Sequence, residues 1–489
     1  MPPAASRPFL LICAAVAVML VGACLGIAGT EWFSRDDFAF LAHVRSDDFR
    51  WSESFLPRGE RFWHFYRPLG MEAYFRLCSQ AFGLDASRWF AVSLAFHFAS
   101  GWLLLGIARR LGFDLRAALA AALLLVSRPP ALDQIFYGSV FHFVLSVFLS
   151  LVAVRCFLEF LLAGPRRWQL ASLLALALAL LTNGVNAVLP AVLLCAGLAA
   201  RPPRRAAGLQ VVRALLPHAL LVGGYALLRI RWIPLVSDRA IYRPEAGLET
   251  LRKLAGMLSE VLGGGLGWAA AAAAGVGLLV LAAGSRPAIR RLGWRGLCLA
   301  GWAAAALAPF ALLPFPQQRY AMLASAPVAL LAGAVFDSAW RGTGGRRPAL
   351  FEAAVALLVI AAIPFGVLAE RATAPRGVHP LGLLRAVEAR SAGLEPGARL
   401  IVLYGAPGLA DSEAAIAYRY LTYNGTVLQA AHPETELTLR FQDLSQRPSR
   451  GATRPGAVYL QLTPELEIED ATPSLLAREL PRGRGAVQR

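Results

Sequence analysis

The residues best suited to chemistry lie near the start of the chain, in a segment rich in aromatic side chains. Asp36 and Asp37 are adjacent, and Tyr66-Arg67-Pro68-Leu69 follows in the same segment. A carboxylate can accept the proton of a reacting hydroxyl, and the planar fork of an arginine matches the oxygens of a phosphate. Trp51 and Trp63 lie between the acids and the arginine. This arrangement predicts a site for a polar ligand.

The elements that must position these residues are membrane helices. Of the 489 residues, 57% are hydrophobic and 16% are charged, whereas a soluble domain has roughly 25% charged residues. The charges gather in short segments between apolar runs of about 20 residues, long enough to cross a hydrocarbon core ~30 Å thick. Many of the arginines behind the formal charge of +17 lie in these segments. They are therefore topology signals rather than a nucleic-acid-binding surface.

The apolar runs predict an all-α polytopic membrane domain over residues 1–369, with about eleven transmembrane helices. The run from 170 to 200 is too long for one crossing, and Thr182-Asn183-Gly184 divides it into two spans joined by a tight turn. The predicted spans are 8–29, 89–108, 117–126, 140–162, the two halves of 170–200, 214–228, three that end near 284, 313 and 337, and 349–368.

Compact arginine clusters follow every second predicted span. Because positive residues stay on the cytoplasmic side, this alternation places the N-terminus in the cytoplasm. The large first loop at 30–88, the segment at 229–253 and the C-terminal region then face outward. The arginine-rich, lysine-poor usage favours a bacterium of high GC content, so we expect the inner membrane and a periplasmic outer face.

The pattern changes in the C-terminal region, residues 370–489. Arg399–Gly405 and Ala457–Leu462 are predicted strands, and residues 412–421 between them have helical character. Short β-rich runs that alternate with a helix predict a small α/β domain, which the topology makes extracytoplasmic. Residues 481–489 have the composition of a disordered basic tail.

The order of several short motifs resembles the GT-C glycosyltransferases, multi-span membrane enzymes that include the protein O-mannosyltransferases. The first loop holds Asp36-Asp37 and Tyr66-Arg67-Pro68-Leu69, and a span with His97 follows. Ser127-Arg128-Pro129-Pro130 is similar to a His-Pro element of these enzymes, and Gln318-Arg319-Tyr320 to their Glu-Arg-Tyr segment. The resemblance covers most of residues 1–340 and is closest to bacterial members with a Tyr-Arg-Pro-Leu element in the first loop.

This resemblance implies transfer of a hexose or pentose from a polyprenyl-phosphate donor to an acceptor hydroxyl on the extracytoplasmic face. It implies Asp36 as the base that takes the acceptor's proton, Asp37 as a supporting acid or metal ligand, and inversion by a single displacement. Arg67 and Arg319 lie in outward loops and are the candidates for binding the donor phosphate, together with Tyr66.

The resemblance implies few fixed partners beyond the bilayer and the lipid-linked sugar. The acceptor is a protein, a glycan or a lipid. The sequence requires no cofactor, although it leaves a divalent cation open. The six cysteines form no CxxC and no zinc-like spacing.

One motif departs from the family pattern. At Thr182-Asn183-Gly184, such enzymes commonly have Ser-Lys-Glu, so any ligand contact of that Lys-Glu pair is missing here. The departure leaves a non-catalytic scaffold as one alternative. A transporter or flippase of lipid-linked glycans is another.

Ionisable residues also fall within the predicted spans. Arg155 and Glu159 stand at i and i+4 and are expected to pair on one helix face. His97 and His142 are expected to be hydrogen-bonded core residues.

Overall fold

The structure is a computed structural model of the whole chain. It describes residues 7–47, 49–55, 66–127, 135–201, 204–232, 252–253, 286–311, 318–342, 352, 380–385, 399–404, 426–431, 438–443, 457–462 and 468–470. Two compact units divide the chain. The first comprises residues 1–27, 51–74 and 89–372, and the second comprises residues 28–50, 75–88 and 373–489.

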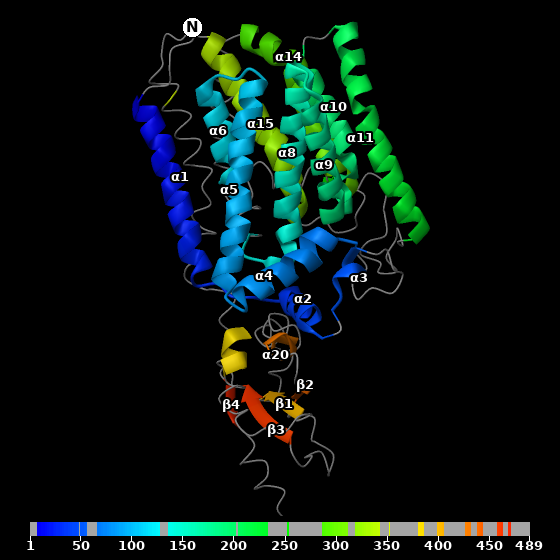
Figure 1. Ribbon diagram of the computed structural model, residues 1–489. Coiled ribbons are helices and arrows are strands. Elements are labelled where there is room, and N and C mark those ends of the chain that lie inside the picture. Colours follow the sequence, from blue (N-terminus) through cyan, green and yellow to red (C-terminus); the bar gives the residue numbers. More distant parts are fainter. Residues whose placement is uncertain are drawn as a thin grey trace, which may run out of the picture. The chain divides into compact units, whose positions relative to one another are not determined.

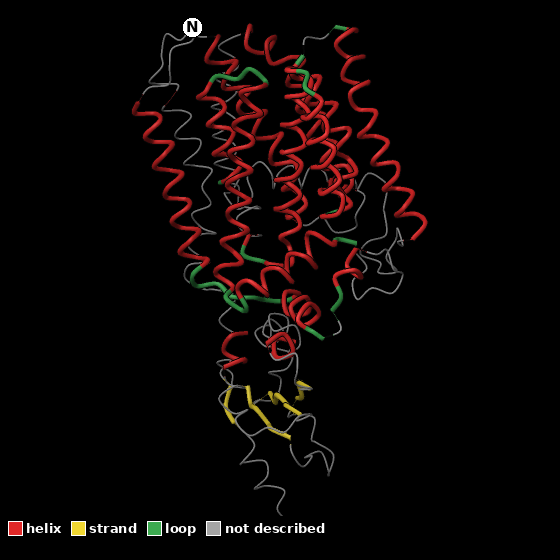
Figure 2. Tube along the Cα trace, viewed as in Figure 1, coloured by secondary structure: helices red, strands yellow, loops and turns green. Residues whose placement is uncertain are grey.

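The described part of the first unit is helical (Figures 1 and 2). Its long helices lie side by side, and α15 packs against both α6 and α14. Its elements are α1 (Arg7–Ala28), α3 (Trp51–Phe55), the π-helix η1 (Pro68–Ala73), α5 (Ala86–Arg110, which begins at the edge of the second unit), α6 (Leu115–Val126), η2 (Gly138–Val140), α8 (Phe141–Ala163), α9 (Arg166–Thr182), η3 (Gly184–Val188), α10 (Leu189–Ala200), α11 (Arg205–Trp232), α14 (Arg286–Ala311), η5 (Gln318–Ala321) and α15 (Met322–Gly342).

Four of the described helices are long and apolar enough to cross a membrane. They are Arg7–Ala28, Ala86–Arg110, Gly138–Ala163 and Arg205–Arg231, and three shorter apolar helices are Leu115–Val126, Gly184–Ala200 and Met322–Ser338. Each of them coincides with a predicted span, so the prediction of a helical polytopic membrane protein is confirmed. The count of eleven stays a prediction, because the span that ends near 284 and almost all of 349–368 lie outside the described residues.

Two helices extend beyond the spans that hydropathy predicts. The helix α11 begins at Arg205 and ends at Trp232, and α14 begins at Arg286. Arginine is a good helix former, so a helix can continue past the apolar run into the polar interface. Hydropathy detects only the part of such a helix that lies in hydrocarbon.

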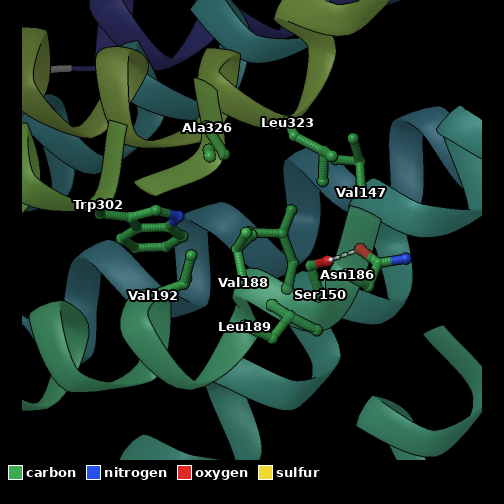
Figure 3. A pocket seen from close by; sticks show the side chains of 11 residues that line it. Val147, Ser150, Asn186, Val188, Leu189, Val192, Trp302, Leu323 and Ala326 are labelled. Carbon is green, nitrogen blue, oxygen red and sulfur yellow. Dashed lines mark hydrogen bonds between the residues drawn. The ribbon is translucent and has the colours of Figure 1, made fainter. Parts of the chain in front are cut away.

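The helices α9 and α10 form a hairpin whose tip is organised by Asn186. The Nδ2 group of Asn186 donates to the carbonyl oxygens of Ala179 (2.7 Å) and Asn183 (3.0 Å) and to Ser146 Oγ (3.0 Å). Its Oδ1 accepts from Ser150 Oγ at 3.2 Å (Figure 3). The amide is fully buried, and every one of its polar atoms is satisfied. The predicted tight turn within 170–200 is therefore confirmed.

A buried carboxylate joins α5 to α8. Glu159 Oε1 lies 2.6 Å from Arg155 Nη2 and 2.9 Å from Arg110 Nε. The predicted pair of Arg155 and Glu159 is confirmed, and the structure adds Arg110 to it. An ion pair that also joins two helices keeps a buried charge compensated.

The second unit contains the described sheet. Its elements are α2 (Asp36–Arg45), most of α4 (Tyr74–Phe82), α20 (Thr426–Ala431), β1 (Arg399–Tyr404), β2 (Thr438–Asp443), β3 (Ala457–Leu462) and β4 (Ile468–Asp470). The strand order is β2-β1-β3-β4, with β1 parallel to β2 and to β3 and β4 antiparallel to β3. The helix α2 packs against α20.

Both predicted strands of the C-terminal region are present as β1 and β3. The helix predicted at 412–421 and the tail at 481–489 lie outside the described residues. The α/β domain as a whole, with its boundary at 370, therefore stays a prediction.

Candidate functional site

The acid pair opens helix α2 in the second unit. Arg35, which precedes it, has a φ of 57°, and this left-handed residue turns the chain into the helix. Asp36 and Asp37 then occupy the first turn. The positive end of the helix dipole lies there and stabilises negative charge.

The two carboxylates have different surroundings. Asp37 is fully buried, its Oδ2 accepts the backbone N–H of Ser34 at 3.3 Å, and its own N–H donates to Ser34 O at 3.2 Å. Reciprocal bonds of this kind close the first turn of a helix, as in a capping box. Asp36 is only partly buried. Asp37 therefore closes the first turn of α2, and Asp36 is the more accessible carboxylate. The predicted chemical roles of both acids stay predictions.

In the first unit, Arg67 stands at the start of the π-helix η1. The N–H of Met71 donates to Arg67 O at 3.1 Å, and Pro68 occupies the first helical position. The wide π turn brings Gly70 against α8 and the end of α9. A Cβ added to Gly70 would lie 2.4 Å from His142 Cβ and 2.8 Å from Thr182 O. Backbone packing therefore fixes the position of Arg67, and only glycine fits at residue 70.

Arg67 is bonded to a histidine at the start of α8. Its Nη1 lies 2.8 Å from His142 Nε2, and His142 Nδ1 lies 2.9 Å from Ser139 O. Arginine has no acceptor, so Nε2 must be the accepting nitrogen and Nδ1–H must donate to the carbonyl. This arrangement fixes a neutral imidazole that orients the guanidinium.

Arg319 supplies a second guanidinium to the same place. The charges of both Arg67 and Arg319 act on the His142 ring. Arg319 Nε is buried and has no hydrogen-bond partner among the described residues. Tyr320, whose ring lies 5.9 Å from Arg319 Cζ, stacks on Phe310 at 4.5 Å. The Arg319 guanidinium therefore lies near a stacked aromatic pair and within electrostatic range of the His142 ring.

Tyr66 directly precedes Arg67 in the chain and is buried. Its hydroxyl donates to Phe55 O at 3.0 Å. This bond ties the segment before η1 to α3. The predicted contact of Tyr66 with a donor phosphate stays a prediction.

The structure thus brings Arg67 and Arg319 together around His142. The acids Asp36 and Asp37 belong to the second unit.

His142 is hydrogen-bonded, as expected, but its partner is the candidate arginine Arg67. The only sequence signal for this role is a histidine beside the outer end of a span. The other histidine, His97, bonds to Val126 O at 2.9 Å and is a core residue.

No group of three or more His, Cys, Asp or Glu side chains that could hold a metal ion is found among the described residues. The possible divalent cation therefore stays a prediction.

A small apolar pocket lies in the first unit beyond the α9–α10 hairpin tip (Figure 3). It is bounded by α8, η3, α10, α14 and α15, and its labelled lining includes Val147, Trp302 and Leu323. Its volume of about 20 Å³ is room for roughly one water molecule. It is too small for a lipid chain.

No protein-family model matches the sequence, and no curated protein is significantly similar to it. The solved structures that share its fold include two of ArnT. Apo ArnT from Cupriavidus metallidurans has a TM-score of 0.53 and 14% identity over 97% of this chain and 95% of that chain. ArnT bound to undecaprenyl phosphate, from the same organism, has a TM-score of 0.50 and 13% identity over 97% of this chain and 96% of that chain.

At these identities the similarity establishes the fold alone. The chain has the fold of the two ArnT structures, in agreement with the membrane-helix architecture that the motif order implies. The subtype with a Tyr-Arg-Pro-Leu element and the link to O-mannosyltransferases stay predictions.

Proposed function

We propose that this chain is a membrane glycosyltransferase that moves a sugar from a polyprenyl-phosphate donor to an acceptor hydroxyl. The observation that carries the proposal is the pair of guanidiniums, Arg67 and Arg319, set around one neutral histidine in a membrane-spanning unit. Two guanidiniums that both act on one histidine suit a doubly charged phosphate. The shared fold supports the same ligand class, because ArnT has been solved with undecaprenyl phosphate.

In the proposed reaction, Asp36 accepts the proton of the acceptor hydroxyl as its oxygen attacks the anomeric carbon. The bond between that carbon and the phosphate oxygen breaks, and the electron pair leaves with the polyprenyl phosphate. Arg67 and Arg319 stabilise the charge that develops on the leaving phosphate. A single displacement inverts the configuration of the anomeric carbon.

The roles of the two acids follow from their surroundings. Asp36 is partly accessible and is the proposed base, whereas Asp37 closes the first turn of α2. The arrangement of arginine clusters supports a cytoplasmic N-terminus and an outward site, and the arginine-rich, lysine-poor usage supports a bacterial inner membrane.

The decisive experiment is transfer of radiolabelled sugar from a panel of polyprenyl-phosphate donors to membrane extracts. Wild type, Asp36→Asn and the control Asp47→Asn are compared, since Asp47 is an exposed acid just beyond α2. We expect labelling in wild type and control and its loss in Asp36→Asn. Equal labelling in all three would remove Asp36 from the chemistry. No labelling with any donor would favour transport of lipid-linked glycans or a scaffold.

A further inference from the structure

Asn183 is a buried amide whose donor group has no partner among the described residues. It is 5% exposed. Its Oδ1 accepts the N–H of Val185 at 3.3 Å and caps η3, which fixes the orientation of the amide. Its Nδ2 is then left as a buried donor without a partner in the described part of the chain. Burying such a group is unfavourable unless something accepts its hydrogens.

Tyr225, on α11, has the same character. Its hydroxyl is buried, with no hydrogen-bond partner among the residues that the structure describes. The hydroxyl lies against Gly184, and a Cβ added there would be 3.0 Å from it. The absence of a side chain at residue 184 therefore provides the space that the Tyr225 hydroxyl occupies.

These two donors belong to the same end of the helical unit as the arginine pair. Thr182, which precedes Asn183, contacts Gly70 of η1. The phenol of Tyr225 lies within electrostatic range of both Tyr66 and Arg67. The four groups therefore lie near one another at this end of the unit. They come from the starts of η1 (Arg67) and η3 (Asn183), from η5 (Arg319) and from α11 (Tyr225).

The chemistry of the four groups is complementary to one ligand. The guanidiniums of Arg67 and Arg319 attract negative charge. The amide of Asn183 and the hydroxyl of Tyr225 can donate to acceptor oxygens. A phosphate monoester or diester offers both, because its oxygens carry the charge and each accepts more than one hydrogen bond.

We propose that Asn183 Nδ2 and Tyr225 Oη donate to phosphate oxygens of the lipid carrier and complete the binding site of Arg67 and Arg319. The inference rests on the ligand class of the proposed function. It also gives a role to Asn183-Gly184, where the sequence departs from Lys-Glu. The asparagine supplies a neutral donor, and the glycine admits the tyrosine hydroxyl.

The test is direct binding of undecaprenyl phosphate to the purified full-length protein, with undecaprenol as the uncharged control ligand. Tyr225→Phe removes only the hydroxyl. Asn183→Asp keeps the acceptor that caps η3 but replaces the donor by a negative charge. We expect Tyr225→Phe to weaken binding about tenfold and Asn183→Asp to weaken it further. Binding of undecaprenol should be unchanged.

A matched pair of glycine variants tests whether the position of the Tyr225 hydroxyl, rather than a general change in α11 or η3, determines the affinity. Gly184→Ala should push the Tyr225 hydroxyl away and reproduce the effect of Tyr225→Phe. Gly224→Ala is the control, since a Cβ there meets no described atom within 4 Å, and it should bind like wild type. An equal loss of undecaprenol binding would show that the variants act on packing, which overturns the inference.

Other outcomes are equally decisive. The inference is overturned if Tyr225→Phe and Asn183→Asp both bind undecaprenyl phosphate like wild type. It is also overturned if the two substitutions weaken binding of inorganic phosphate but not of undecaprenyl phosphate. Because the assay measures binding without transfer, it separates this inference from the proposed function. Intact phosphate binding with no sugar transfer would contradict only the latter.

Discussion

Arg67 and His142 are separated by 75 residues in the sequence and are joined by a bond of 2.8 Å between Nη1 and Nε2. The histidine is itself held by Ser139 O through its other nitrogen. A chain of backbone carbonyl, imidazole and guanidinium therefore sets the direction of Arg67. Preorganisation of this kind lets a cation act on charge that develops during a reaction without having to rearrange.

The first prediction concerns His142 as a positioning residue. In His142→Phe, Arg67 loses its acceptor, and we expect the KM for the donor to rise about tenfold with a smaller change in kcat. His142→Gln should restore much of the affinity, because its amide oxygen can accept from Arg67. Steady-state kinetics measure both. An equal fall in kcat and kcat/KM for His142→Phe, without rescue, would contradict the positioning role.

The second prediction concerns Arg67 itself. Lysine keeps the charge but has no planar fork, so Arg67→Lys should lower kcat/KM at least about tenfold. Arg109→Lys is the matched control. Arg109 lies on α5, donates to Phe113 O at 2.7 Å and is not part of the site, so its replacement should leave kcat/KM within about twofold. Wild-type kinetics in Arg67→Lys would show that its charge alone is sufficient.

The third prediction separates the two adjacent acids. Asp37→Ala removes the acceptor for Ser34 N–H and should lower the free energy of unfolding by about 1 kcal/mol. Asp36→Ala should leave the stability close to that of wild type but abolish transfer. Thermal unfolding in detergent and the transfer assay measure the two effects. Loss of activity without loss of stability in Asp37→Ala would assign chemistry to Asp37 as well.

The fourth prediction concerns the close approach at Gly70. A methyl group there would meet His142 Cβ and Thr182 O, which belong to packed helices and cannot move aside. We expect Gly70→Ala to cost about 2–3 kcal/mol of stability and to displace Arg67. Gly26→Ala in α1 is the control, because a Cβ there meets nothing described within 4 Å. Equal melting temperatures for both variants would contradict the packing at η1.

The fifth prediction concerns the amide at the hairpin tip. Asn186→Leu leaves the Ser146 and Ser150 hydroxyls without this partner, while the carbonyl oxygens of Ala179 and Asn183 keep their backbone N–H donors. We therefore expect a loss of about 2–3 kcal/mol. Ser150→Ala removes a single bond of the same network and should cost about 1 kcal/mol. The ratio of the two losses is the measurement. Similar values would mean that the network does not depend on Asn186.

The fold follows from the sequence where local patterns determine it. The apolar runs located the membrane helices, and β-rich runs located β1 and β3 at their actual positions. The pair of Arg155 and Glu159 was predictable, because i and i+4 on one helix are neighbours whatever the helix packs against.

The candidate site was predictable only in part. The motif order pointed to Arg67 and Arg319, but nothing in their sequence context indicates His142 or Tyr225 as neighbours. Those contacts depend on how η1, α8 and α11 pack, and no local pattern encodes that packing. The different surroundings of Asp36 and Asp37 likewise depend on the folded structure, in which Asp37 is buried and exchanges two bonds with Ser34. Adjacency in the sequence conceals this difference.

The length of α9 has a consequence for the bilayer around it. With 17 residues, this helix rises only about 25 Å, whereas the hydrocarbon core is ~30 Å thick. Leu170 and Leu174 on α9 are exposed, and we expect lipids beside them to shorten or tilt, which is a hydrophobic mismatch. Because α9 ends directly before Asn183, this local thinning is expected beside the proposed phosphate site. The acyl-chain length of the surrounding lipids should therefore influence how readily a polyprenyl phosphate reaches the site.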